Sequence, residues 1–89
     1  MKKIAVISAI LEDPEGTQQK FNEIVANFKG LIRGRMGLPM PEVSASLISI
    51  AVIGETDDIN NLTGKLGKIP GISVKTAMSK KDYPVKAVL

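Results

Sequence analysis

The side chains best suited to chemistry are two acidic clusters, each placed directly after an apolar segment. The first cluster follows residues 3–11, and the second follows residues 44–53. The members are Glu12, Asp13 and Glu15, and Glu55, Asp57 and Asp58. We expect both segments to be strands that run parallel, so that the clusters meet at one sheet edge, where oxygen ligands could hold Mg²⁺ or Ca²⁺. The alternative is that both sets cap helix N-termini and complement the helix dipoles. Because no cation-loop spacing is present, the sequence favours the alternative and predicts no metal site.

Two arginines form a second candidate. Arg33 and Arg35 are two positions apart, so a strand would place both side chains on one face. Guanidinium groups bind carboxylates and phosphates. We expect the pair to contact acidic residues of a partner copy or to be solvated, and the alternative is an anionic ligand bound between subunits. The candidate ligand-binding set is Arg33, Arg35, Asp13, Glu15 and Gly16.

Several classes of activity conflict with the composition. The chain has no Cys and no His, which excludes the usual zinc sites and Cys or His nucleophiles. The two G-x-x-G tetrapeptides, at 34–37 and 64–67, do not join two predicted helices, as a nucleic-acid-gripping loop of the KH type must. A sheet that binds RNA displays aromatic residues, and this chain has only 2 Phe and 1 Tyr. We therefore expect no enzymatic activity, no cofactor and no direct nucleic-acid contact.

The elements that must position these residues follow from hydrophobic spacing. Strands are predicted at 3–11, 31–38, 44–53 and 72–79. One helix is predicted to begin at Pro14, after an Asp13 cap, and to stop at Gly30. Its apolar face is Phe21, Ile24, Val25 and Phe28. A second helix is predicted from a cap at Thr56 to a stop at Gly67. Its apolar face is Ile59, Leu62 and Leu66.

The order βαββαβ predicts an α+β fold, the ferredoxin-like plait. We expect right-handed crossovers from the first strand to the third and from the second to the fourth. The result is a four-stranded antiparallel sheet of order 4-1-3-2 with both helices on one face. The domain is expected to span residues 1–80, with a C-terminal tail at 81–89 that is held by a neighbouring copy or by crystal contacts.

The first and third strands are apolar on both alternating faces, and two helices can cover only one. The bare face predicts a homo-oligomer, and the alternative is a monomer with a tolerated apolar patch. The expected oligomer interface is Ala5, Ile7, Ala9, Leu47, Ala51 and Ile53.

Charge is uneven along the chain. Residues 1–61 carry 6 basic and 8 acidic side chains and residues 62–89 carry 6 and 1, which together make the 12 and 9 of the whole sequence. Scattered lysines of this kind are typical of solvating charge. No apolar run approaches the length of a membrane span, and we expect a cytoplasmic protein without a membrane partner.

Two motifs resemble a small bacterial family, the iron-only hydrogenase system regulators. They are Arg35-Met36-Gly37-Leu38-Pro39 and the stretch from Leu62 to Thr76, LTGKLGKIPGISVKT. The resemblance implies an ACT-like fold, assembly into dimers or tetramers and a relation to the regulatory domain of nickel-responsive repressors. Those repressors hold metal through His and Cys, which this chain lacks. ACT domains bind amino acids at the first strand-to-helix turn, where Gly16 is the approximate counterpart of their glycine.

The resulting hypothesis is a non-enzymatic regulatory or ligand-sensing homo-oligomer. It takes a small-molecule effector and, because no segment is left over to read DNA, acts through a regulatory protein partner. One alternative is a plait that binds nucleic acid with its Lys-rich C-terminal third. Another is a metal-dependent enzyme that uses both acidic clusters.

Overall fold

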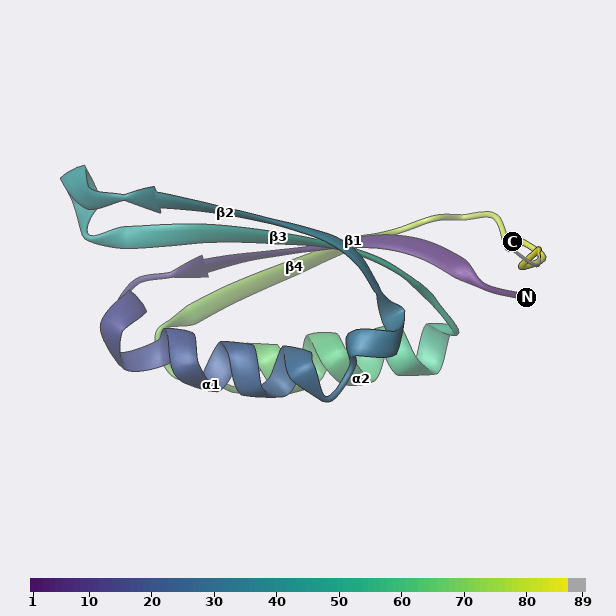
Figure 1. The fold of residues 1–89 in the computed structure, drawn as a ribbon, viewed down its shortest axis with the longest axis horizontal. Coiled ribbons are helices and arrows are strands. Elements are labelled where there is room, and N and C mark those ends of the chain that lie inside the picture. The colour runs from purple at the N-terminus through teal and green to yellow at the C-terminus, as the bar shows by residue number, and fades with distance from the viewer. Residues whose placement is uncertain (87–89) are drawn as a thin grey trace.

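The computed structural model describes residues 1–86 as one antiparallel sheet covered on one face by two helices (Figure 1). The strands are β1 (Lys3–Leu11), β2 (Ile32–Met40), β3 (Ala45–Gly54) and β4 (Ile72–Met78), in the order β2-β3-β1-β4. The helices are α1 (Pro14–Ala26) and α2 (Thr56–Gly67), with 3₁₀ turns η1 (Lys29–Leu31) and η2 (Pro41–Val43) on either side of β2. The predicted fold class and strand order are confirmed.

The central strands run antiparallel, which corrects the expectation that they are parallel. Lys3 lies opposite Gly54 and Leu11 opposite Ser46. The crossover through α1 joins β1 to β2, with β3 between them in the sheet. The crossover through α2 joins β3 to β4, with β1 between them. The strand ends that precede the two acidic clusters therefore lie at opposite ends of the sheet.

The core lies between the helices and the lower face of the sheet in Figure 1. Strand alternation turns the odd-numbered residues of β1 and the even-numbered residues of β3 toward the helices. The predicted buried face of α2 is confirmed. Of the apolar face predicted for the first helix, Ile24 is only partly buried, and Phe28, also partly buried, lies beyond the end of α1. The buried apolar residues are Ala5, Ile7, Ala9, Leu11, Phe21, Val25, Ile48, Ile50, Val52, Ile59, Leu62, Leu66 and Ile69.

The helix ends differ from the prediction by a few residues. α1 ends at Ala26, and Gly30 lies inside η1 rather than in a left-handed stop. Thr56 is the first residue of α2, after Glu55 at the N-cap position. Asp57 and Asp58 in the first turn of α2 complement its dipole, as the alternative interpretation of the acidic clusters expects, and Lys65 does so in the last turn.

A bulge at the start of β2 sets which of its side chains face the helices. Ile32 lies opposite Val52 but Gly34 lies opposite Ala51, so Arg33 is an extra residue. Ile32 and Arg35 consequently share the helix side. Strict alternation does not continue through a bulge, so Arg35 lies on the same face as Ile32, whereas regular alternation over 31–38 would place it on the opposite face.

The C-terminal tail contacts the N-terminal residues of the same chain. Tyr83 forms a bridge with Lys2, with backbone N–H to O distances of 2.7 and 2.8 Å. The Lys3 ammonium donates to the carbonyl of Lys80 at 2.9 Å and pairs with Asp82 at 3.4 Å. Up to Tyr83 the tail is thus held by Lys2 and Lys3 of its own chain, and its attachment to a neighbouring copy stays a prediction. The last three residues, which include Val88, lie outside the described part. None of the described helices is long and apolar enough to cross a bilayer.

Candidate effector cavity and interaction surface

The turn between β1 and α1 is built around the backbone carbonyl of Asp13. That oxygen accepts the N–H groups of Gly16 and Thr17 at 3.1 Å and the Thr17 hydroxyl at 2.7 Å. Asp13 thus caps α1 with its main chain, and its carboxylate makes no cap hydrogen bond. The N–H of Glu12 donates to the carbonyl of Gly71 at 2.9 Å. Gly71 has φ +85°, so only glycine adopts this contact without strain. The turn is held in one position by these bonds.

A cavity of about 580 Å³ separates this turn from the β2–β3 hairpin. Its walls are the acidic turn on one side and prolines and small hydroxyl residues on the other. The hairpin side is shaped by Ser44, whose φ of 55° is left-handed and whose N–H donates to Pro41 at 3.2 Å. The lining residues are Asp13, Pro14, Glu15, Pro39, Pro41, Ser44, Ala45 and Ser46.

A second hollow of about 260 Å³ adjoins the first and shares Pro39 and Ser46 with it. Arg35 lies at its margin. The guanidinium donates to Asn22 Oδ1 at 2.7 Å and lies 5.5 Å from the centre of the Phe21 ring. Arg35 is therefore fixed against α1.

The predicted ligand set is only partly brought together. Asp13 and Glu15 line the larger cavity, and Arg35 lines the adjoining hollow. Arg33 lies at the other end of β2 and donates to the carbonyl of Gly30 at 3.1 Å. Gly16 is exposed and lines neither cavity, and a Cβ there would come within 2.5 Å of Asp13 Oδ2.

The hairpin residues of the cavity are the part that sequence reasoning missed. The available signal was the pair of prolines at 39 and 41, next to a serine in a connection that must turn sharply. Within residues 1–86, no three acidic side chains gather at a metal-binding spacing. The reason is the antiparallel pairing of β1 and β3, which separates the two clusters.

The upper face of the sheet in Figure 1 has no helix over it, and we call it the open face. Cross-strand pairing arranges its residues in rows that run across the strands. The bulky row is Ser73, Ile10, Leu47 and Leu38; the central row is Lys75, Ser8, Ser49 and Met36; the small row is Ala77, Val6, Ala51 and Gly34. Beyond the small row, Ile4 pairs with Ile53. Lys75 is thus the only charged residue in these rows.

The open face leaves large apolar side chains in solvent. Val6 is 41% exposed, Ile10 48% and Met36 54%. Ser8 and Ser49 lie near the middle, with their hydroxyl oxygens 3.4 Å apart. The face is therefore apolar around a small polar centre.

The predicted interface set is divided between the two faces of the sheet. Its β3 members do lie on the open face; they are Leu47, Ala51 and Ile53. Its β1 members, Ala5, Ile7 and Ala9, are at most 1% exposed and pack under the helices. This half of the set is wrong, because these three residues pair across the strands with Val52, Ile50 and Ile48. The β1 residues of the open face are Ile4, Val6 and Ile10.

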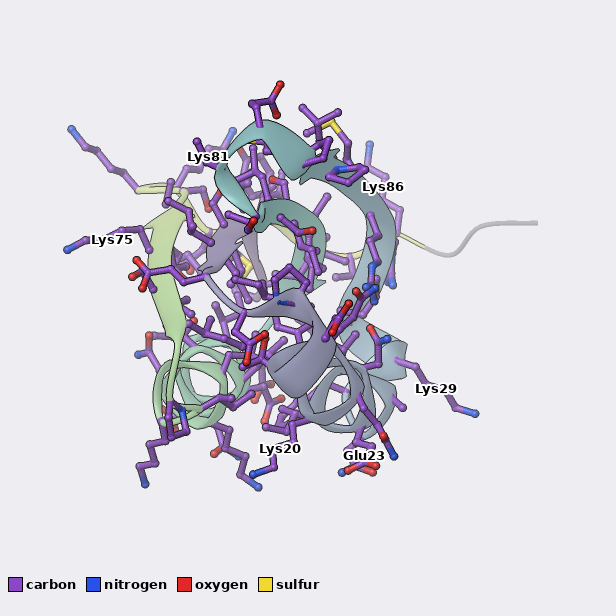
Figure 2. The ribbon with its side chains drawn as sticks, turned by 90° about the vertical axis from the view of Figure 1, so that its left-hand side faces the viewer. Lys20, Glu23, Lys29, Lys75, Lys81 and Lys86 are labelled. Carbon is purple, nitrogen blue, oxygen red and sulfur yellow. The ribbon has the colours of Figure 1, made fainter. Side chains whose placement is uncertain are left out.

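Apart from the lysines at the end where the tail meets β1, the lysines do not gather into one surface. Figure 2 shows that Lys20, Lys29 and Lys75 point in different directions from the body of the molecule. Lys65 lies over the Phe28 ring, at 5.7 Å from its centre, and Lys81 over the Tyr83 ring, at 5.3 Å. This distribution lacks the continuous stripe that phosphate backbones require.

A family of known proteins matches most of this chain. Residues 3–76 match the family model TM1266-like, described as "Iron-only hydrogenase system regulator, putative". The chain belongs to this family. Family membership gives the chain a regulatory role as its coarse function.

Two solved structures show the same architecture. The uncharacterized protein TM1266 from Thermotoga maritima is 34% identical, with a TM-score of 0.85 over 90% of this chain and 100% of that one. The de novo designed protein Foldit4 is 10% identical, with a TM-score of 0.59 over 92% of this chain and 100% of the design, and it shows the fold alone. The curated proteins include no match to this chain.

Proposed function

We propose that this chain is a non-enzymatic, cytoplasmic regulatory domain of an iron-only hydrogenase system, and that it works as a homo-oligomer joined through the open face. The observation that supports the proposal most strongly is the apolar open face. Membership of a regulator family supports the functional half of it. The absence of Cys and His from the sequence argues against metal sensing of the nickel-repressor kind.

The energy available on the open face is large for so small a domain. Each half-exposed aliphatic side chain gains about 1 kcal/mol when its remaining surface is covered, since full burial is worth about 1.5–3 kcal/mol. The contributing side chains are Ile4, Val6, Ile10, Met36 and Leu38. Their sum of about 5 kcal/mol is comparable to the whole stability of a marginal domain, about 5–15 kcal/mol. A partner that covers this face is therefore strongly favoured.

The dimensions of the face suit a second copy. A strand of nine residues is about 30 Å long and four strands are about 20 Å wide, which gives about 600 Å² of sheet. A standard interface uses about 800 Å² of each partner. The chain segments that rise at the two ends of the sheet in Figure 1, η2 and the tail, supply additional contact.

The cavity beside the β1–α1 turn is the proposed effector site. It is large enough for a small metabolite, and such sites lie in concave, mostly apolar pockets with a few polar groups. Its proline walls meet that description, and the carboxylates of Asp13 and Glu15 favour a ligand with a cationic group. Arg35, held by Asn22 in the adjoining hollow, could receive an anionic group of the same ligand only by leaving that contact. Effect on DNA would pass through a regulatory protein partner.

A gene-replacement experiment in the host tests the proposal. Deleting the gene is expected to change hydrogenase transcript or enzyme levels, and the wild-type gene is expected to restore them. The variant Ile10→Lys, which places a charge on the open face, is expected to fold but not to restore them, whereas Asn60→Lys on the exposed side of α2 is expected to restore them fully. Unchanged hydrogenase levels in the deletion strain would contradict the regulatory role.

Native mass spectrometry of protein purified from the host tests the effector site. A retained small molecule is expected with the wild-type protein and is expected to be lost from the double variant Asp13→Asn, Glu15→Gln. Retention of the same mass by the double variant would place the molecule elsewhere.

A further inference from the structure

We propose that the two copies pack open face to open face with their strands antiparallel, so that the acidic end of one copy covers the basic end of the other. This inference rests on the proposed face-to-face assembly and adds its orientation. Two orientations satisfy a two-fold axis lying in the interface. The axis either runs along the strands or runs across them.

Charge at the two ends of the molecule favours an axis across the strands. The end of the molecule that carries the hairpin and the start of α1 holds four exposed acidic residues: Glu12, Asp13, Glu15 and Glu42. One exposed lysine, Lys68, stands at the same end, where α2 finishes on the helix side of the sheet. The opposite end, where the tail meets the start of β1, holds five lysines: Lys2, Lys3, Lys80, Lys81 and Lys86. Four carboxylates lie at that end as well: Glu55 and Asp82 pair with Lys2 and Lys3, and Asp57 and Asp58 stand in the first turn of α2, on the helix side of the sheet and away from the open face. The remaining three lysines make no ion pair within residues 1–86.

Each orientation places these ends differently. An axis along the strands stacks acidic end on acidic end and basic end on basic end. An axis across the strands stacks acidic on basic at both ends of the dimer. Complementary charge favours association and opposes the wrong register. The long shape of the molecule, 42 Å against 23 and 22 Å, keeps the two ends far apart, so the choice of axis matters.

The size of the side chains in the rows favours the same axis, independently of charge. An axis that crosses the strands at the central row places each strand over the equivalent strand of the second copy. It lays the bulky row of one sheet over the small row of the other. Ile10 then faces Val6, Leu47 faces Ala51, and Leu38 faces Gly34.

Large side chains that face small ones fill the space between two sheets, about 10 Å apart, without clash or void. An axis along the strands instead lays bulky row on bulky row and small row on small row, which opens a gap at one end. Lys75 lies over its counterpart in the proposed dimer, but it belongs to the edge strand β4, and Figure 2 shows its side chain pointing away from the sheet. Ser8 and Ser49 form the shared polar centre.

Spin-label distances between copies test the orientation. The chain has no cysteine, so single-cysteine variants can be labelled at one site each. Glu42→Cys marks the acidic end, and Lys75→Cys marks the edge of the central row. We expect the two labels at position 42 to be separated by close to the 42 Å length of the molecule and the labels at position 75 to be much closer together.

Sedimentation of the same labelled samples separates the possible failures. A dimer whose labels at position 42 lie less than half the molecular length apart overturns the orientation and leaves the proposed assembly in place. Long separations at both positions overturn it as well, because the copies then join through another surface. A sample that is monomeric and gives no dipolar signal overturns the proposed assembly and this inference together. Val43→Cys, at a neighbouring exposed position, provides the same measurement if the label at 42 disturbs association.

Salt dependence is the second readout. With oppositely charged ends stacked, added salt is expected to weaken the dimer, because screening removes attraction between exposed charges. Stronger association at high salt would contradict the orientation, since it indicates repulsion between like ends.

Discussion

The two faces of the sheet have nearly the same apolar content and very different surroundings. On β1, Ile7 is fully buried under the helices and Ile10, three residues later, is 48% exposed on the open face. The helix-covered face is completed within one chain, and the open face is not. An apolar strand face therefore does not by itself reveal whether its cover lies in the same molecule.

The largest expected effect is on the helix-covered face. Ile7→Ala leaves a cavity among Ile50, Phe21 and their neighbours and is expected to lower the free energy of unfolding by about 2–5 kcal/mol. Ile10→Ala, the matched substitution on the open face, is expected to cost less than about 1 kcal/mol in the monomer. Urea unfolding at low protein concentration measures both. Equal losses of unfolding free energy in the two variants would contradict the assignment of Ile7 to the helix-covered face and Ile10 to the open face.

The open face is expected to give the largest effect on assembly. Val6→Lys places an unpaired charge in the small row and is expected to raise the dimer dissociation constant by about 100-fold or more, since each 1.4 kcal/mol is a factor of ten and a buried unpaired charge costs several. Analytical ultracentrifugation of the variant measures this change. Gln19→Lys, on the exposed side of α1, is the control and is expected to associate like the wild type. An unchanged constant for Val6→Lys would place the interface elsewhere.

A smaller effect is expected at the turn that joins α2 to β4 on the helix-covered side. Gly71→Ala is expected to cost about 1–2 kcal/mol of folding stability, because alanine is strained at φ +85°. Gly64→Ala, inside α2 with open space around its Cα, is expected to gain up to about 1 kcal/mol. Thermal unfolding distinguishes the two. A stabilised Gly71→Ala would be inconsistent with the described turn.

The smallest effects are expected at two adjacent residues of β2. Because of the bulge, Arg35 faces the helix side and Met36 faces the open side. Arg35→Ala removes the contacts with Phe21 and Asn22 and is expected to lower the stability of the monomer by about 0.5–1 kcal/mol. Met36→Ala is expected to leave monomer stability almost unchanged and to weaken the dimer. Chemical unfolding and sedimentation of both variants test this reversal. The opposite result would mean that β2 has no bulge.

Much of the fold could be predicted from local patterns. The apolar positions of α2 identified its buried face, and the order of elements identified the plait. The pairing direction of β1 and β3 was predicted wrongly, because the crossovers were assumed to join neighbouring strands. The same error led to the prediction that the two acidic clusters meet at one edge of the sheet.

The sites were harder to predict because they depend on three-dimensional pairing. Period-2 alternation separates Ile7 from Ile10, but it does not say which of two apolar faces the helices cover. Arg33 carries no local signal for a bulge beyond the neighbouring Gly34. The cavity joins a turn at Asp13 to a hairpin at Pro41, a long way along the chain, and only the antiparallel register brings them to the same end of the sheet.

The most direct measurement of the central claim is the mass of the unmodified protein in solution as a function of concentration. Sedimentation equilibrium is expected to show a dimer or larger assembly at micromolar concentration that dissociates on dilution. A single monomeric species throughout that range would contradict the claim that a second copy covers the open face.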